Sequence, residues 1–262
     1  MKSILLLTLF VLFQHSAYGW TLNRSTKKGF NKNKIVIYIA NTDCSNAGFS
    51  ASHLVTLIKE SVEDYWNSVP SSALKLEVKG LRSDIDISSD THATARAKIG
   101  YNQIIAGCND NTALGFDNGS ILGSAQSECS GDNCKSAFIL NAHANTNLKN
   151  FQEHELKAII AHEIGHSIGL GHSEYKYALM YYAVGGKYQQ WLSMDDINGV
   201  SALYPHESND LFGVPILSNC GSIDINPSKT HHNSLISFFA GLLMMMLLLS
   251  TNLLKRLIVK YL

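Results

Sequence analysis

The stretch that decides the fold runs from His162 to Tyr182 and reads HEIGHSIGLGHSEYKYALMYY. On a helix, residues four apart project from the same face, so the imidazoles of His162 and His166 can bind one ion together. Gly169 permits the positive-φ turn that ends a helix, which lets the chain swing back and offer His172 as a third ligand. The pattern therefore predicts a metal site formed by His162, His166 and His172.

Three imidazole ligands indicate a catalytic zinc ion rather than a structural one. A catalytic zinc has three protein ligands and keeps its fourth position for water, whereas a structural site is closed. Glu163 directly follows the first ligand, so its carboxylate can approach a water on the zinc rather than the ion itself. Zinc acidifies that water and polarises a carbonyl group. Glu163 can then act as general base and return the proton to a leaving amine, so we expect one catalytic Zn²⁺ and hydrolysis of peptide bonds.

Residues 1–19 predict a secretory signal peptide. They read MKSILLLTLFVLFQHSAYG, with a basic residue near the start, an apolar run, and small residues at Ala17 and Gly19 ahead of Trp20. That order is typical of a signal cleaved after Gly19. The alternative is an uncleaved signal anchor, although the apolar run is short for a membrane span.

A second apolar segment, residues 234–254, contains no charge and is long enough to cross a bilayer. The basic tail at residues 255–262 favours the cytoplasmic side, and residues 207–233 lack periodicity and are expected to be a stalk. We therefore expect a membrane-anchored protein whose catalytic domain lies outside the cytoplasm, at the cell surface or in the periplasm. A core helix, a cleaved lipid-anchor signal and a bacterial C-terminal sorting region that includes Cys220 are the alternatives.

Composition excludes some partners and indicates the redox compartment. The formal net charge is zero, so nothing indicates a nucleic-acid partner. The five cysteines favour disulfides in an exported chain. The turn-like sequence CSGDNC predicts a local bridge between Cys129 and Cys134. Cys44 with Cys108 is then the natural second pair and Cys220 is left over, although spacing alone does not fix this connectivity. Zinc thiolates are the alternative, but the spacings fit no common pattern.

Hydrophobic patterning indicates one mixed α+β domain over residues 20–206. Alternating or β-branched runs predict strands, and Asn- and Asp-rich sequence predicts a loop at residues 107–119. The expected strands are residues 34–40, 73–80, 83–89, 120–127 and 135–143. Apolar residues at helical spacing predict helices after Ser50 as far as residue 69, over residues 151–168, and over residues 192–204.

The string HEIGHSIGLGH resembles the metzincin zinc motif HExxHxxGxxH. ALMYY places Met180 eight residues beyond His172, an interval that resembles that of the matrixins, the matrix metalloproteinase family and its bacterial relatives. LSMDDINGVSALYP, with Asp195 and Asp196, is similar to the final matrixin helix. SILGSAQS is similar to the matrixin edge strand, and FILNAH to the strand beside it. The resemblance covers most of residues 20–206.

This resemblance implies a metzincin/matrixin-like catalytic domain: a twisted, mixed five-stranded sheet, with one antiparallel edge strand, and three helices. Met180 would be the Met-turn residue, and the chain would act as a monomer on protein or peptide substrates. Tyr181 and Tyr182 stand where the family has a proline that shapes the specificity pocket. Tyr182 also falls where the astacins and serralysins have a zinc-ligand tyrosine, although we expect it to be a pocket-wall residue. Substrate would pair by β-augmentation with the edge-strand residues Ile121, Leu122, Gly123, Ser124 and Ala125.

Other features depart from the family pattern. No cysteine-switch propeptide follows the signal, so latency by a zinc-bound thiol is not expected. The His-x-Asp run of the structural zinc is missing, and His143 is interpreted as a surface or core histidine. A calcium site near Asp110 and Asp117 is a further option without a recognisable spacing. The alternative function is a membrane-tethered, catalytically inactive zinc-fold binding protein. The sequons at Asn23 and Asn118 matter only in a glycosylating host.

Overall fold

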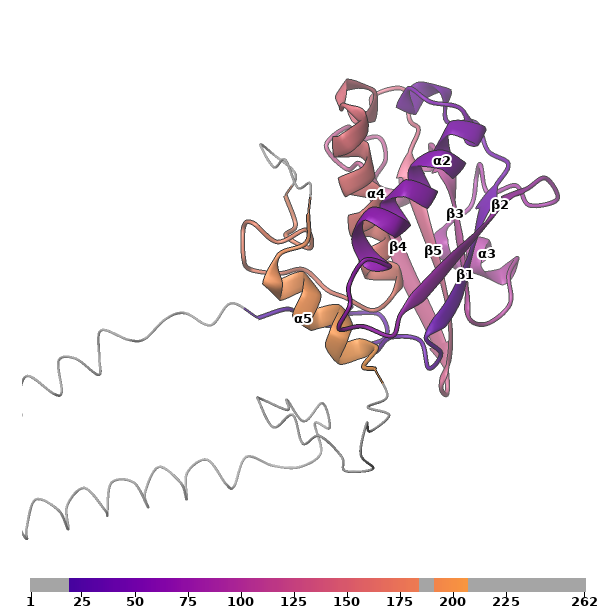
Figure 1. Ribbon diagram of the computed structural model, residues 1–262. Helices are drawn as coiled ribbons and strands as arrows, with labels where there is room; N and C mark the ends of the chain where they lie inside the picture. Colours follow the sequence, from indigo (N-terminus) through magenta and orange to yellow (C-terminus); the bar gives the residue numbers. More distant parts are fainter. Residues whose placement is uncertain (1–18, 184–190, 207–262) are drawn as a thin grey trace, which may run out of the picture. The chain divides into compact units, whose positions relative to one another are not determined.

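A mixed five-stranded sheet organises the computed structural model, which describes residues 19–183 and 191–206 (Figure 1). The strand order is β2-β1-β3-β5-β4. The edge strand β4 runs antiparallel to β5, and the other neighbours are parallel. The predicted mixed sheet with one antiparallel edge strand is therefore confirmed. The strands are β1 (Lys34–Ala40), β2 (Lys75–Arg82), β3 (Gln103–Asn109), β4 (Gly123–Ser130) and β5 (Asn133–Asn141).

Two helices, α2 (Ala51–Ser61) and α4 (Glu153–Ser167), lie side by side on one face of the sheet (Figure 1). The Ser50 side chain caps α2 as predicted and accepts a hydrogen bond from the backbone N–H of His53 at 3.1 Å. A wider π-helical turn, Val62–Trp66, follows α2. The main core between helices and sheet contains the buried side chains of Ile35, Ile37, Ile39, Leu54, Leu57, Ile58, Ile104, Phe138, Leu140, Ile160 and Ile164.

The opposite face of the sheet is covered by a short helix, α3 (His92–Ala97), which packs on β5 and β3. Thr91 caps this helix by accepting a hydrogen bond from the backbone N–H of Thr94. A second, smaller core lies here and contains Ala40, Ile85, Ile87, Ala95, Ile105, Phe116, Ala137 and Ile139. Helix α3 is additional to the three expected helices, the last of which is α5 (Met194–Leu203).

Two local predictions were wrong. Residues 83–89 form turns and irregular backbone rather than a strand. Their alternation reflects Ile85 and Ile87, which are buried in the smaller core without a strand partner. The loop expected from residue 107 begins later, because β3 continues to Asn109 and buries Cys108. The sequence patterns had not predicted β3 at all.

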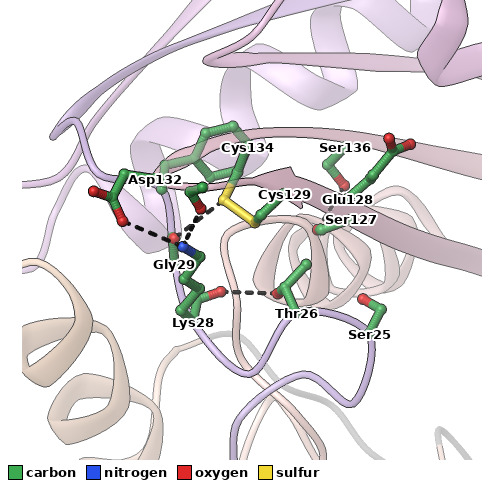
Figure 2. The surroundings of a disulfide bond; sticks show 12 residues. Ser25, Thr26, Lys28, Gly29, Ser127, Glu128, Cys129, Asp132, Cys134 and Ser136 are labelled. Carbon is green, nitrogen blue, oxygen red and sulfur yellow. Dashed lines mark hydrogen bonds and ion pairs between the residues drawn. A yellow bond between two sulfur atoms is a disulfide. The ribbon is translucent and has the colours of Figure 1, made fainter.

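Both expected disulfides are present, Cys44–Cys108 and Cys129–Cys134. The second closes the hairpin between β4 and β5, because the register pairs its two cysteines directly. Figure 2 shows Lys28 beside this hairpin, where its Nζ lies 3.5 Å from Oδ1 of Asp132 and donates to the carbonyl of Gly131. Lys28, near the start of the domain, thus contacts the tip of the hairpin at Gly131 and Asp132. Cys220 lies outside the described residues.

Within residues 19–183 and 191–206, no helix is long and apolar enough to cross a membrane. The predicted stalk (207–233), span (234–254) and tail (255–262) lie outside the described residues, as does the predicted signal peptide except for Gly19.

Candidate metal centre and active site

Helix α4 and the turn after it bring the three predicted histidine ligands together. One nitrogen from each of His162, His166 and His172 lies within 4.8 Å of the others. The helix stops because Gly169 adopts a φ of 112°. A Cβ at this position would lie 2.7 Å from the carbonyl oxygen of Lys28, so glycine is required for this turn. The turn directs His172 back toward the two helical ligands.

Backbone carbonyls orient two of the imidazoles. Nδ1 of His162 lies 2.7 Å from the carbonyl oxygen of Leu179, and Nδ1 of His166 lies 2.9 Å from that of Leu170. Because a carbonyl only accepts, each Nδ1 carries the proton and each Nε2 keeps a lone pair for a metal. Burial lowers the pKa of His166 to about 4, which keeps this ring neutral at physiological pH.

The donor set fits zinc. Two nitrogens bound to a tetrahedral zinc at about 2.0–2.1 Å lie roughly 3.3 Å apart. The Nε2 atoms of His166 and His172 are separated by 3.1 Å. His162, His166 and His172 could therefore hold a zinc ion with little rearrangement. In the part of the chain that the structure describes, Asp110 and Asp117 belong to no such group of three ligands, and Nδ1 of His143 accepts from the backbone N–H of Asn145.

Glu163 lies in the same cavity as the three histidines, which has a volume of about 660 Å³. Its Oε2 is buried and has no hydrogen-bond partner among the described residues. Burial raises the pKa of this carboxyl group to about 8. A buried carboxyl oxygen without a partner therefore lies in the same cavity as three convergent imidazoles, and a cation bound by those imidazoles would lower the pKa of Glu163 again and favour its carboxylate form.

Met180 packs against α4 at Gly165, between the two helical histidines in the sequence. It is 2% exposed, and a Cβ at Gly165 would lie only 2.3 Å from its sulfur, so the side chain packs directly on the backbone of α4. The Asp196 carboxylate fixes this turn by accepting from the backbone N–H groups of Leu179 at 2.8 Å and Met180 at 3.0 Å. The sequence had indicated Asp196 only as half of an acidic pair. The Ser-x-x-Asp pattern at the start of α5 explains its capping role but not this contact.

The N-terminal segment Thr21–Asn23 pairs with the loop that carries the third ligand, a contact that no sequence pattern indicated. The backbone N–H of Gly171 donates to the carbonyl of Thr21 at 2.7 Å, and that of Asn23 donates to Gly169 at 2.8 Å. Nδ2 of Asn23 also donates to the carbonyl of His166 at 2.7 Å. Asn23 is buried, so this sequon residue has a structural role at the metal centre.

The predicted substrate-binding residues line the cavity beside Glu163. Ile121 and Leu122 precede β4, and Gly123, Ser124 and Ala125 form its first three positions. A Cβ at Gly123 would lie 3.1–3.2 Å from atoms of the Glu163 side chain, so the strand runs close to the carboxylate. The far edge of β4 has no strand partner in the described sheet.

The two predicted pocket tyrosines lie on the same side of the centre as His172. Tyr182 is 67% exposed, lines the cavity, and its ring centroid lies 6.3 Å from that of His172. Tyr181 lines a neighbouring cavity of about 740 Å³ together with Arg24 and Glu174. The structure thus places both tyrosines near the metal centre, and only Tyr182 lines the cavity that holds Glu163.

Comparison with known proteins identifies the family. The matrixin family model matches residues 65–205, more than half of the chain. Interstitial collagenase from Sus scrofa is 48% identical over 63 residues, which are 23% of this chain and 13% of the collagenase. Matrix metalloproteinase-19 from Mus musculus is 45% identical over 60 residues, 22% of this chain and 11% of that protein.

The aligned part thus spans roughly an eighth of the collagenase. Metalloproteinase-II from Bacteroides fragilis superposes with a TM-score of 0.42 and 16% identity over 73% of this chain and 59% of that chain. On its sequence match over residues 65–205, the chain belongs to the matrixin family of zinc metalloendopeptidases.

Proposed function

We propose that this protein is an active zinc-dependent endopeptidase in which Glu163 is the general base. One observation carries the proposal: three imidazoles directed at one point and an unpartnered carboxylate share a cavity with an open strand edge. A structural metal site needs neither the carboxylate nor the open edge.

The edge strand supports binding of an extended peptide. The backbone N–H of Asn141 in β5 donates to the carbonyl of Leu122. In an antiparallel ladder only every second residue bonds to the neighbouring strand. Gly123 and Ala125 therefore direct their N–H and C=O groups away from β5, toward the open edge. A substrate strand can hydrogen-bond to those groups and so pass its scissile carbonyl over Glu163.

The reaction then follows from the positions of the side chains. Zinc, when bound by His162, His166 and His172, supplies an acidified water and polarises the scissile carbonyl. Glu163 accepts the proton of that water and delivers it to the leaving amine. The carbonyl oxygens of Leu179 and Leu170 hold two of the imidazoles in the tautomer that the metal requires.

The proposed site of action is outside the cytoplasm. The proposal takes residues 1–19 as a signal peptide, 20–206 as the catalytic domain, 207–233 as a stalk, 234–254 as a membrane anchor and 255–262 as a cytoplasmic tail. The two disulfides support export, because such bonds persist in oxidising compartments. The substrates would be extracytoplasmic proteins, and the enzyme would act as a monomer.

The test compares zinc-loaded wild type with Glu163→Ala on casein and on a quenched peptide library. We expect turnover by the wild type and a loss of at least about 100-fold in kcat for the variant, at equal zinc content. Equal activity of the two proteins would refute the Glu163 mechanism. An inactive, fully zinc-loaded wild type would favour a binding protein. Alkaline extraction and the intact mass of the mature chain would test the membrane anchor separately.

A further inference from the structure

Two side chains of α3 contact the edge strand β4 from the face of the sheet opposite α4. Nε2 of His92 lies 3.0 Å from the carbonyl oxygen of Ser124. One turn later, Nη1 of Arg96 donates to the carbonyl of Gln126 at 3.0 Å and to its side-chain oxygen at 3.1 Å. Nε of Arg96 also lies 3.4 Å from the carboxylate of Glu128. Helix α3 therefore bonds to three alternate residues of β4.

The two α3 side chains are themselves buried. His92 is 8% exposed and Arg96 is 6% exposed, although arginine is usually at the surface. Because the Ser124 carbonyl only accepts, Nε2 of His92 must carry a proton and donate. A buried donor that loses its acceptor costs more folding free energy than a solvated donor. Displacing β4 from His92 and Arg96 is therefore unfavourable.

The two bonded carbonyls belong to the residues of β4 that face β5. Ser124 pairs with Ile139 and Gln126 pairs with Ala137, so α3 adds a further donor to carbonyls already in the ladder. Gly123 and Ala125, next to them in the chain, present the outward groups, and the Glu163 side chain packs on Gly123 from the other face. The orientation of the open edge is therefore set by contacts on both faces of β4.

We propose that His92 and Arg96 are positioning residues that hold β4 in the orientation needed to pair with an extended peptide. The inference rests on the proposed peptidase function and assigns to α3 a role in substrate binding. It implies that these residues stabilise complexes with peptides long enough to pair along β4. The binding of short substrates, which are held only at the metal, should depend much less on these two residues.

The experiment measures peptide binding separately from turnover. In the Glu163→Ala background, the Kd of an eight-residue peptide is measured by fluorescence anisotropy for His92→Leu, His92→Gln and His92→Asn. A Gln amide can reach about as far as Nε2, whereas an Asn amide cannot, so this pair tests the hydrogen bond even if His92→Leu fails to fold. Ile87→Val is the matched control, because Ile87 is buried in the smaller core and its aliphatic side chain cannot hydrogen-bond to β4.

We expect His92→Asn and His92→Leu to raise the Kd about 5- to 30-fold, the effect of losing one buried hydrogen bond, and His92→Gln to stay within about 3-fold of wild type. In the Glu163-intact enzyme, the same variants should raise KM for the long peptide by a larger factor than KM for a dipeptide-length substrate. The inference would be overturned if the variants raised KM equally for long and short substrates. It would also be overturned if Ile87→Val raised the Kd of the peptide as much as His92→Asn does. Wild-type turnover tests the proposed function independently, since the anisotropy assay needs no hydrolysis.

Discussion

The two disulfides should contribute unequally to stability, because they close chain loops of very different length. Cys44–Cys108 spans 64 residues and Cys129–Cys134 spans 5. The loop-closure entropy lost by the unfolded chain corresponds to roughly 4 kcal/mol for the long loop and about 2 kcal/mol for the short one at 25 °C. Replacing each pair by alanine should therefore lower the free energy of unfolding by those amounts.

Thermal unfolding of the zinc-loaded domain, residues 20–206, gives the measurement. For a domain of this size, 1 kcal/mol corresponds to a change in Tm of about 2–4 °C. The Cys44→Ala/Cys108→Ala variant should lose roughly 8–16 °C, and Cys129→Ala/Cys134→Ala roughly 4–8 °C. Urea unfolding at 25 °C checks the ranking without extrapolation in temperature. If the hairpin variant loses as much stability as the long-loop variant, loop closure does not explain the contribution of these bonds.

Three further substitutions test the packing around the site. Gly165→Ala should destabilise the protein by roughly 1–3 kcal/mol in urea unfolding, because its Cβ would overlap the sulfur of Met180; a more stable variant would contradict the packing described. Asp196→Asn should cost roughly 2–3 kcal/mol and speed zinc release to a chelator, because an amide cannot accept from the N–H groups of both Leu179 and Met180; unchanged zinc release would contradict its role. Burial lowers the pKa of His92, so stability that is full above about pH 6.5 is lost as the pH falls below it. When zinc-loaded protein is titrated with acid, the free energy of unfolding should fall less steeply for His92→Gln than for wild type. Identical dependence of that free energy on pH in the two proteins would refute this.

The local elements were predictable because their signals are local. The strand at Lys34–Ala40 and the ligand set on α4 and the turn after it follow from periodicity and spacing within a few residues. The mixed sheet with one antiparallel edge strand followed from the family resemblance rather than from periodicity, whereas the order of its strands was not predicted. Both disulfides were anticipated, although the spacing alone left their connectivity open.

The missed elements depend on distant contacts. Helix α3 has only six residues, and two of them, His92 and Arg96, are polar side chains stabilised by β4 some 30 positions away. The roles of Asp196 and Asn23 likewise arise from hydrogen bonds to residues far along the chain. The two partners of each hydrogen bond lie too far apart in the sequence to fall within one helix or strand pattern, so periodicity does not predict such contacts.

The pairing of the N-terminal segment with the third-ligand loop has a consequence for the order of assembly. Thr21 and Asn23 bond to residues 151 and 143 positions later, and the turn at Met180 is fixed by Asp196, later still. Contacts of such high sequence separation form late, because the intervening chain must first be ordered. While Asp196 is still inside the ribosome, the nascent chain therefore lacks the contact that fixes the turn at Met180. Under the proposed activity, the enzyme is therefore inert until synthesis has passed Asp196.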